Sequence, residues 1–174
     1  MPRSRSQTLT FALLGLLAAL LAGCASTPPP APTADRVEVY KSIRTLKLLQ
    51  GDRVIREYRV ALGDNPHGHK EHEGDERTPE GEYILDWRNP NSSFHKSLHV
   101  SYPNEMDRLR ARLRGVEPGG IIMIHGRPSY ITRPAVLREY AGRDWTDGGI
   151  AVQNHDMDEI WAAVRDGTPI RIDP

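Results

Sequence analysis

The sequence is poor in cysteine, in net charge and in long apolar runs. Cys24 is its single cysteine, which excludes an internal disulfide and a zinc site built from several thiolates. Its formal net charge is +0, so no excess of positive charge favours a nucleic-acid partner. Its main apolar run, at residues 9–21, is shorter than the roughly 20 residues of a transmembrane helix.

Residues 1–24 have the pattern of an export signal. Arg3 and Arg5 supply a positive start, and the apolar run follows them. The tetrapeptide Leu21-Ala22-Gly23-Cys24 resembles the bacterial lipobox, in which the cysteine becomes the lipidated first residue of the mature protein. Ala25 stands where an aspartate tends to retain lipoproteins at the inner membrane, so we expect an outer-membrane lipoprotein that faces the periplasm. The alternative is an ordinary cleavable signal that happens to contain a cysteine.

Two further segments follow the signal. Residues 25–34 are rich in Pro, Ser and Thr and predict an extended tether without a core. Residues 35–174, about 140 in number, have the size of one domain with a single modest core.

Within this domain, alternating apolar residues predict strands, and helical spacing predicts three helices. The strands are expected at residues 37–48, 54–62, 83–87, 94–102 and 169–172, with the fully apolar run 121–124 as the central buried strand. The helices are expected from the cap Asn104 to Gly115, from Pro134 to Gly142, and from Asn154 to Gly167. In the last of these, Met157, Ile160, Trp161 and Val164 form the buried stripe.

A long polar stretch at residues 63–81 contains His67, His69 and His72 between acidic residues. Their spacing matches neither a helix face nor a known zinc signature, so the sequence predicts a solvated surface loop without a metal. A metal site in this loop is the alternative.

The stretch from Gly119 to Asn154 carries the chemistry-bearing pattern. His125 ends an apolar strand, and Thr146-Asp147-Gly148-Gly149 forms a Gly-rich turn before the next apolar residues. In an acyl-transfer site, a histidine at a strand end faces a nucleophile on such a turn. Here position 149 carries glycine instead.

Several motifs together resemble the L,D-transpeptidase (YkuD) family, over about residues 36–173. They are GDERTPEGEY at 74–83, RNPNS at 88–92, SLHVSYPN at 97–104, IHG at 124–126 and TDGGIAV at 146–152. The resemblance implies one mostly β domain, a sandwich or barrel with flanking helices. It also implies chemistry without a cofactor, in which a cysteine thiolate attacks the amide between the third and fourth residues of a peptidoglycan stem peptide. The acyl group then passes to an amine or to water.

The resemblance also implies roles for individual residues. His125 occupies the position of the base, and the Gly148-Gly149 turn that of the oxyanion donors. The substrate-binding positions are Gly126, Tyr130, Trp145, Thr146 and Asp147.

The sequence departs from the family where the nucleophile belongs, because Gly149 replaces the cysteine. Thr146 and Ser129 are weak candidates for a replacement. We therefore expect a domain that recognises stem peptides, a wall-linked lipoprotein or a partner enzyme without covalent chemistry. The alternatives are an altered copy of an active cell-wall L,D-transpeptidase or L,D-peptidase, and a metal-binding or structural envelope protein.

Overall fold

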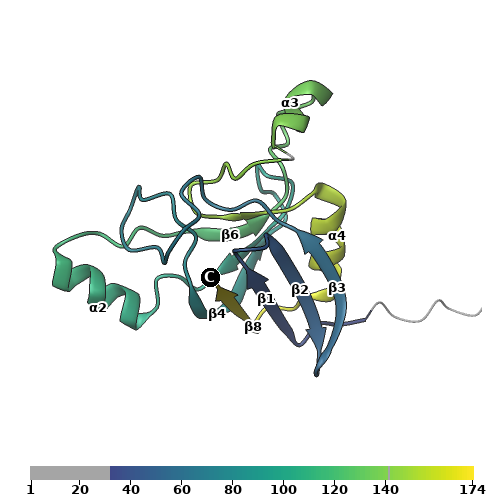
Figure 1. The fold of residues 1–174 in the computed structure, drawn as a ribbon. Helices are drawn as coiled ribbons and strands as arrows, with labels where there is room; N and C mark the ends of the chain where they lie inside the picture. Colours follow the sequence, from purple (N-terminus) through teal and green to yellow (C-terminus); the bar gives the residue numbers. More distant parts are fainter. Residues whose placement is uncertain (1–31, 141) are drawn as a thin grey trace, which may run out of the picture. The chain divides into compact units, whose positions relative to one another are not determined.

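The computed structural model describes residues 32–140 and 142–174 (Figure 1). The export signal, Cys24 and tether residues 25–31 lie outside the described residues. The described chain forms an eight-stranded sheet with three helices, in the strand order β3-β2-β1-β8-β4-β5-β6-β7. The predicted fold class, a mostly β domain with flanking helices, is confirmed.

The first three strands pair antiparallel in chain order, with turns at residues 41–44 and 51–52. They are β1 (Arg36–Tyr40), β2 (Thr45–Gln50) and β3 (Arg53–Arg59). The apolar residues that alternate along β1 and β2 are fully buried and form one side of the core: Val37, Val39, Leu46 and Leu48.

The remaining strands are β4 (Gly81–Asn89), β5 (Ser97–Val100), β6 (Ile122–His125), β7 (Ile150–Ala151) and β8 (Thr168–Asp173). The apolar run 121–124 was predicted to be central, and this prediction is wrong: β6 lies second from one edge, and Ile121 is exposed at a positive φ of 52°. The central place belongs to β8, which pairs parallel with β1 and antiparallel with β4. The apolar character of a segment did not predict its place in the sheet, because pairing between distant segments sets the strand order.

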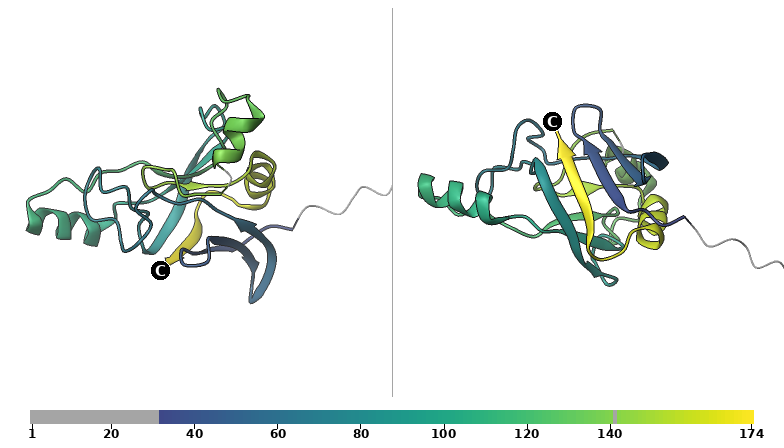
Figure 2. Two further views of the ribbon diagram at one scale, coloured as in Figure 1. Left: turned by 45° about the horizontal axis from the view of Figure 1, so that its top comes forward. Right: turned by 90° about the horizontal axis from the view of Figure 1, so that it is seen from below.

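The sheet is curled, as the views in Figure 2 show, and two isolated bridges join its ends. Just after β3, Ala61 pairs with Ala151 of β7, and Gly63 pairs with Thr146. The Gly-rich turn at residues 146–149 therefore lies at the seam where the curled sheet closes.

Helix α4 (Asn154–Ala163) covers the core as its stripe predicted. Met157 and Ile160 are fully buried, and Trp161 packs against the core. The helix ends earlier than the predicted stop at Gly167, because Val164 already has an extended backbone. Helix α3 (Pro134–Tyr140) begins at the predicted proline.

Helix α2 (Glu105–Arg114) extends away from the sheet (Figure 1). Its predicted ends are confirmed: Asn104 and Asp107 form a reciprocal capping box, and Gly115 closes the helix in the left-handed conformation. Within the described chain, no helix has the length and apolarity needed to cross a membrane.

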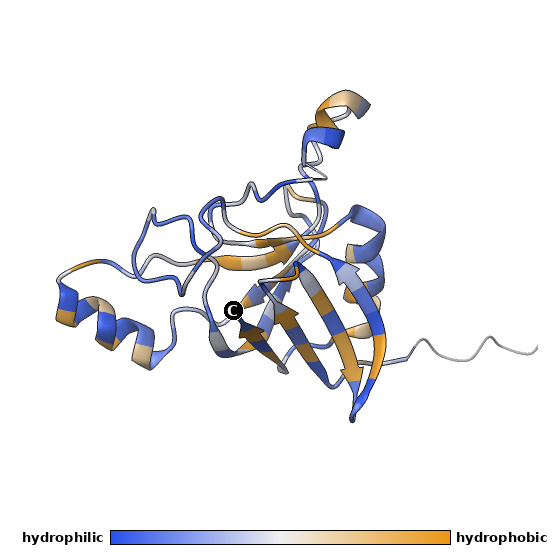
Figure 3. Cartoon of the chain, in the orientation of Figure 1, coloured by the Kyte–Doolittle hydropathy of each residue, from blue (hydrophilic) through white to orange (hydrophobic). Residues whose placement is uncertain are grey.

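The buried face of α2 is not the apolar stripe that its spacing indicates. Met106, Leu109 and Leu113 are exposed, whereas Asp107 and Ala111 are buried, and Figure 3 shows orange segments on this projecting helix. The Asp107 carboxylate is buried because it accepts a hydrogen bond from the Tyr83 hydroxyl at 3.0 Å and lies 3.1 Å from Nε2 of His69. A polar network, rather than apolar burial, therefore docks this helix.

The segment 63–81 is a surface loop, as its composition predicts, but a few buried polar residues anchor it to the domain. Lys70 and Asp75 form a buried ion pair at 2.8 Å, and Asp75 also accepts three backbone N–H bonds. Burial by itself raises the pKa of Asp75, but Lys70 and these N–H groups together lower it to about 2. Because internal charge pairs replace water as partners, the polar segment can pack against the domain.

The histidines of this segment make separate contacts. Nδ1 of His69 accepts a hydrogen bond from the Glu80 N–H, while Nδ1 of His72 contacts the Glu73 carbonyl at 2.8 Å. In the chain as described, no group of three possible metal ligands converges.

Candidate functional site

His125 ends β6 between two neighbouring strands. It pairs with Ser97 of β5 on one side and with Ala151 of β7 on the other. Its side chain is buried, with 8% of the residue exposed. The two ladders fix the backbone of His125, so its ring has a defined position at the seam of the sheet.

The hydrogen bonding of His125 defines its tautomer. Nδ1 lies 2.8 Å from the Gly126 carbonyl oxygen, which can only accept, so Nδ1 carries the proton and donates it. Burial lowers the pKa of His125, and the bond to Gly126 opposes that shift. The imidazole is therefore neutral at neutral pH, and Nε2 keeps a lone pair, as a general base requires.

Aromatic rings hold the imidazole from two sides. The ring of Phe94 lies 4.9 Å from that of His125, and the ring of Trp145 lies 5.6 Å away in an edge-on arrangement. Trp145 also packs on Phe94 and on Tyr140 of α3. This packing restricts the rotation of His125 and excludes water from its faces.

Gly149 lies directly against Nε2 of His125. A Cβ built on Gly149 would be 2.8 Å from Nε2 and 3.2 Å from the Met123 carbonyl oxygen, whereas real Cβ contacts are longer than 3.0 Å. The backbone of Gly149 does not lie in the left-handed region, so its conformation does not require glycine. The position of the histidine, and not the backbone, therefore leaves room only for glycine.

Gly148, in contrast, is constrained by its own backbone conformation. Its φ is +118°, and a Cβ there would lie 2.6 Å from the Arg77 carbonyl oxygen. Its N–H donates to Oγ1 of Thr146 at 3.2 Å, and this hydroxyl donates in turn to the Gly149 carbonyl at 2.7 Å. The turn is therefore held by internal bonds, and among the described residues the N–H of Gly149 has no partner.

The hydroxyls considered as replacement nucleophiles have other roles. Thr146 is buried and its hydroxyl bonds are those that close the turn. Oγ of Ser129 accepts from the N–H of His95 at 3.0 Å. Neither hydroxyl has a hydrogen bond to His125, so neither is activated by it.

A cleft of about 510 Å³, here called the Gly149 cleft, opens beside this site. It brings together His125, Gly149, Trp145, Thr146 and Asp147. Its other walls come from the end of β4 and the loop after it, from β5, and from the start of β6 with the residues before it: Trp87, Asn89, Ser92, Ser93, Phe94, Ser97, Gly120, Ile121, Ile122 and Met123.

Two of the predicted substrate-binding residues do not line this cleft. Gly126 lies behind the imidazole, where its carbonyl orients the ring, and Tyr130 is 71% exposed on the surface. Sequence reasoning overlooked Phe94 as a site residue, and it left open whether Ser97 lines a cleft or faces solvent. The alternation of residues 94–102 placed Ser97 on a polar face, but only the pairing of β5 with β6 places it beside His125.

The family model of the YkuD L,D-transpeptidase catalytic domain matches residues 34–172 of the chain. A candidate L,D-transpeptidase of Escherichia coli (strain K12), YafK, is 31% identical over 97 residues, which are 52% of this chain and 37% of YafK.

Solved structures of L,D-transpeptidases and related proteins are similar to this chain in fold. The helical cell shape determining protein Pgp2 of Campylobacter jejuni is similar at a TM-score of 0.60 with 26% identity, over 79% of this chain and 46% of Pgp2. An L,D-transpeptidase of Xylanimonas cellulosilytica shares the fold at a TM-score of 0.50 with 18% identity, over 91% of this chain and 69% of that one. The chain thus spans less than half the length of YafK and of Pgp2.

Proposed function

The chain belongs to the family of L,D-transpeptidase catalytic domains, as its motifs predicted, and on that premise we propose that its cleft binds peptidoglycan stem peptides without cleaving them. The main observation behind the proposal is a short distance: Nε2 of His125 lies 2.8 Å from the position that a Cβ atom on Gly149 would occupy. A cysteine is absent there, and the base occupies part of the space that one would need.

The groups that remain suit recognition of a peptide bond. The neutral Nε2 of His125 can accept a hydrogen bond, and the N–H of Gly149 can donate one. Trp87, Phe94 and Trp145 give the cleft apolar walls against which a peptide can bury surface. Without a nucleophile, however, no acyl-enzyme can form.

Binding to purified peptidoglycan sacculi tests this proposal. Ser93 is exposed and lines the cleft, so Ser93→Trp fills the cleft without disturbing the core. Gln50→Trp is the matched control, because Gln50 is exposed at the end of β2. We expect the wild type and Gln50→Trp to be retained by sacculi, and Ser93→Trp to be retained at least about tenfold less.

Two outcomes contradict the proposal. Equal retention of all three proteins, or of none, means that the cleft does not bind stem peptides. Release of D-alanine from tetrapeptide-containing muropeptides by the wild type means that the chain is an active enzyme.

In a second candidate function, the chain is an altered copy of an active L,D-transpeptidase or L,D-peptidase. The backbone of Gly149 favours it, because that backbone accepts an L-residue if His125 moves. Gly149→Cys incubated with tetrapeptide muropeptides should then form an acyl adduct visible by mass spectrometry. Gly120→Cys places a thiol in the same cleft as a control. An adduct on neither variant, or equally on both, removes this candidate.

We also propose that Cys24 carries the lipid that anchors the domain at the outer membrane, facing the periplasm, where it can meet the wall and a wall-linked lipoprotein or partner enzyme. The lipobox-like Leu21-Ala22-Gly23-Cys24 supports this. Incorporation of an alkyne-labelled fatty acid should depend on Cys24, and Cys24→Ala should leave the outer-membrane fraction. A labelled Cys24→Ala protein, or an unlabelled wild type, would show that the anchor is elsewhere or missing.

A further inference from the structure

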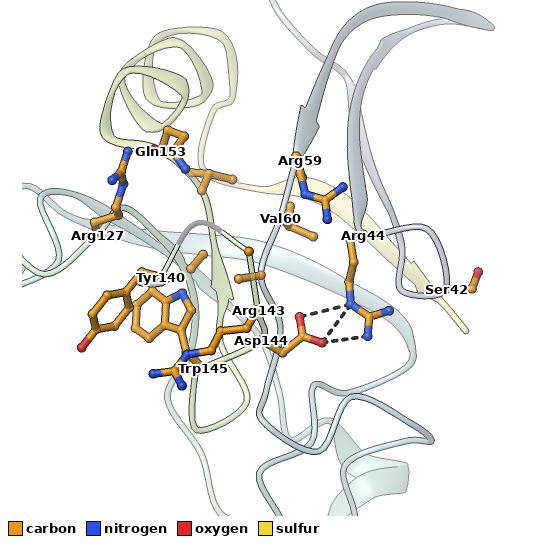
Figure 4. A pocket seen from close by; sticks show the side chains of 14 residues that line it. Ser42, Arg44, Arg59, Val60, Arg127, Tyr140, Arg143, Asp144, Trp145 and Gln153 are labelled. Atoms are coloured by element: carbon orange, nitrogen blue, oxygen red, sulfur yellow. Dashed lines mark hydrogen bonds and ion pairs between the residues drawn. The ribbon is translucent and has the colours of Figure 1, made fainter. Parts of the chain in front are cut away.

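A second pocket lies on the other side of Trp145 (Figure 4). It has a volume of about 370 Å³ and is here called the arginine pocket. Its walls come from the segments around β1–β3, from the connection between β6 and α3, and from both sides of β7. The charged and polar residues among its lining are Ser42, Arg44, Arg59, Arg127, Tyr140, Arg143, Asp144 and Gln153.

One of its arginines is paired internally. Nη2 of Arg44 lies 2.7 Å from Oδ2 of Asp144, and Nε of Arg44 lies 2.9 Å from the same oxygen, as the dashed lines in Figure 4 show. Asp144 also accepts the N–H of Leu62. This carboxylate is thus already satisfied by one guanidinium and one backbone group.

The other three arginines lack such a partner. Arg59, Arg127 and Arg143 form no ion pair within the described part of the chain, and Figure 4 draws no bond from them to the other lining residues. They come from the end of β3, from the connection after β6 and from the segment before β7. Three arginines without an ion pair therefore line one pocket, and Figure 4 shows their guanidinium groups on different sides of it.

Such an arrangement favours an anion for physical reasons. Like charges on the walls of a cleft raise the local potential and concentrate counter-ions. Guanidinium groups also present planar pairs of donors that match the oxygens of phosphate and carboxylate. Gln153, at the same pocket, is the N-cap of α4 and makes no side-chain capping bond, and the first turn of this helix also carries the acidic Asp156.

We propose that the arginine pocket binds a phosphate group. Asp144 neutralises Arg44, and the three other arginines leave the pocket lining positive, which favours a phosphate because it carries close to two negative charges. The volume takes a phosphate with a small attached group. The group can belong to a free phosphorylated molecule or to a phospholipid headgroup. This proposal is independent of peptide binding at the Gly149 cleft.

Calorimetric titration of the full chain with inorganic pyrophosphate at constant ionic strength tests the proposal. Arg59→Gln and Arg143→Gln each remove an exposed guanidinium, and we expect each to weaken binding about tenfold. Arg53→Gln removes an exposed arginine from the far end of β3 and should bind like the wild type. Because these residues are exposed, the variants should keep the wild-type melting temperature.

Two further arms distinguish the sources of the phosphate. Binding of glycerol 3-phosphate with the same dependence on Arg59 and Arg143 indicates a free phosphorylated molecule. Cosedimentation with phosphatidylglycerol vesicles but not with phosphatidylcholine vesicles, lost in the Arg59→Gln, Arg143→Gln double variant, indicates a headgroup.

The proposal is overturned if pyrophosphate does not bind, if the double variant binds it as tightly as Arg53→Gln does, or if succinate binds more tightly than pyrophosphate. The last result would mean that the pocket selects carboxylates.

Discussion

The Gly149 cleft and the arginine pocket share Trp145 as a wall but differ in what they offer a ligand. The Gly149 cleft keeps the histidine and the Gly-rich turn of the family pattern, yet position 149 has no side chain and the Thr146 hydroxyl is engaged within the turn. The arginines of the arginine pocket lie outside the family motifs that the sequence displays, yet three of them line it without an ion pair in the described chain. On the proposed functions, a family motif outlasts its chemistry, and arginines without an ion pair mark a site that no motif reveals.

The two adjacent glycines of the turn, Gly148 and Gly149, differ in the reason why a side chain is disfavoured. Gly148 is required by its own backbone, whereas Gly149 is required only by the neighbouring His125. Substitutions at these two positions should therefore have different costs, and they give the sharpest tests of the comparison.

The largest effect is expected for Gly148→Ala. A φ of +118° disfavours any side chain, and the new Cβ would meet the rigid Arg77 carbonyl at 2.6 Å. We expect the free energy of unfolding to fall by at least about 3 kcal/mol, measured by urea denaturation. Gly120→Ala, with open space around its Cβ, is the control and should change it little. Similar values for both variants would contradict the assigned strain.

A smaller effect is expected for Gly149→Ala. Its methyl group displaces a side-chain end rather than backbone, so the loss should be roughly 1–3 kcal/mol. The ring of His125 should move, and its NMR resonances should shift more than those of His69. Unchanged resonances would mean that the turn, not the histidine, makes room for the methyl group.

The next effect concerns pH. Because burial lowers the pKa of His125 below its ordinary 6.5, the unfolded chain binds a proton at this residue that the folded chain does not. Its contribution to stability is complete above about pH 6.5 and is lost as the pH falls toward the folded pKa, by at most about 1.4 kcal/mol per pH unit.

His125→Gln should reduce this slope between pH 7.5 and pH 5.5, as measured by urea denaturation at several pH values. An equal slope in wild type and variant would show that His125 does not titrate in this way.

The smallest effect is expected for Asp144→Asn in the arginine pocket. Loss of the carboxylate frees charge on Arg44, so pyrophosphate should bind about three- to tenfold more tightly. The pair is partly solvated, and the stability should change by about 1 kcal/mol or less. Calorimetry measures the affinity, and weaker binding would contradict the role of charge in this pocket.

The positions of many strands and helices in the domain were predictable, because they depend on local sequence patterns. Alternation located β1, β2, β3 and β8, and the Asn104 and Gly115 caps located both ends of α2. The face of α2 was not predictable in this way. Its apolar residues are exposed because Asp107, a polar residue, is held by Tyr83 and His69 from distant parts of the chain.

The sequence by itself predicted the family and located His125 and Gly149 within its motifs, because motifs depend on residue identity and spacing. Only the tertiary structure decided where these groups stand. Closure of the sheet brings Nε2 of His125 against Gly149, and the packing of three separate segments gathers Arg59, Arg127 and Arg143. The physical reason is that contacts between distant segments follow from strand order and burial, which no local pattern encodes.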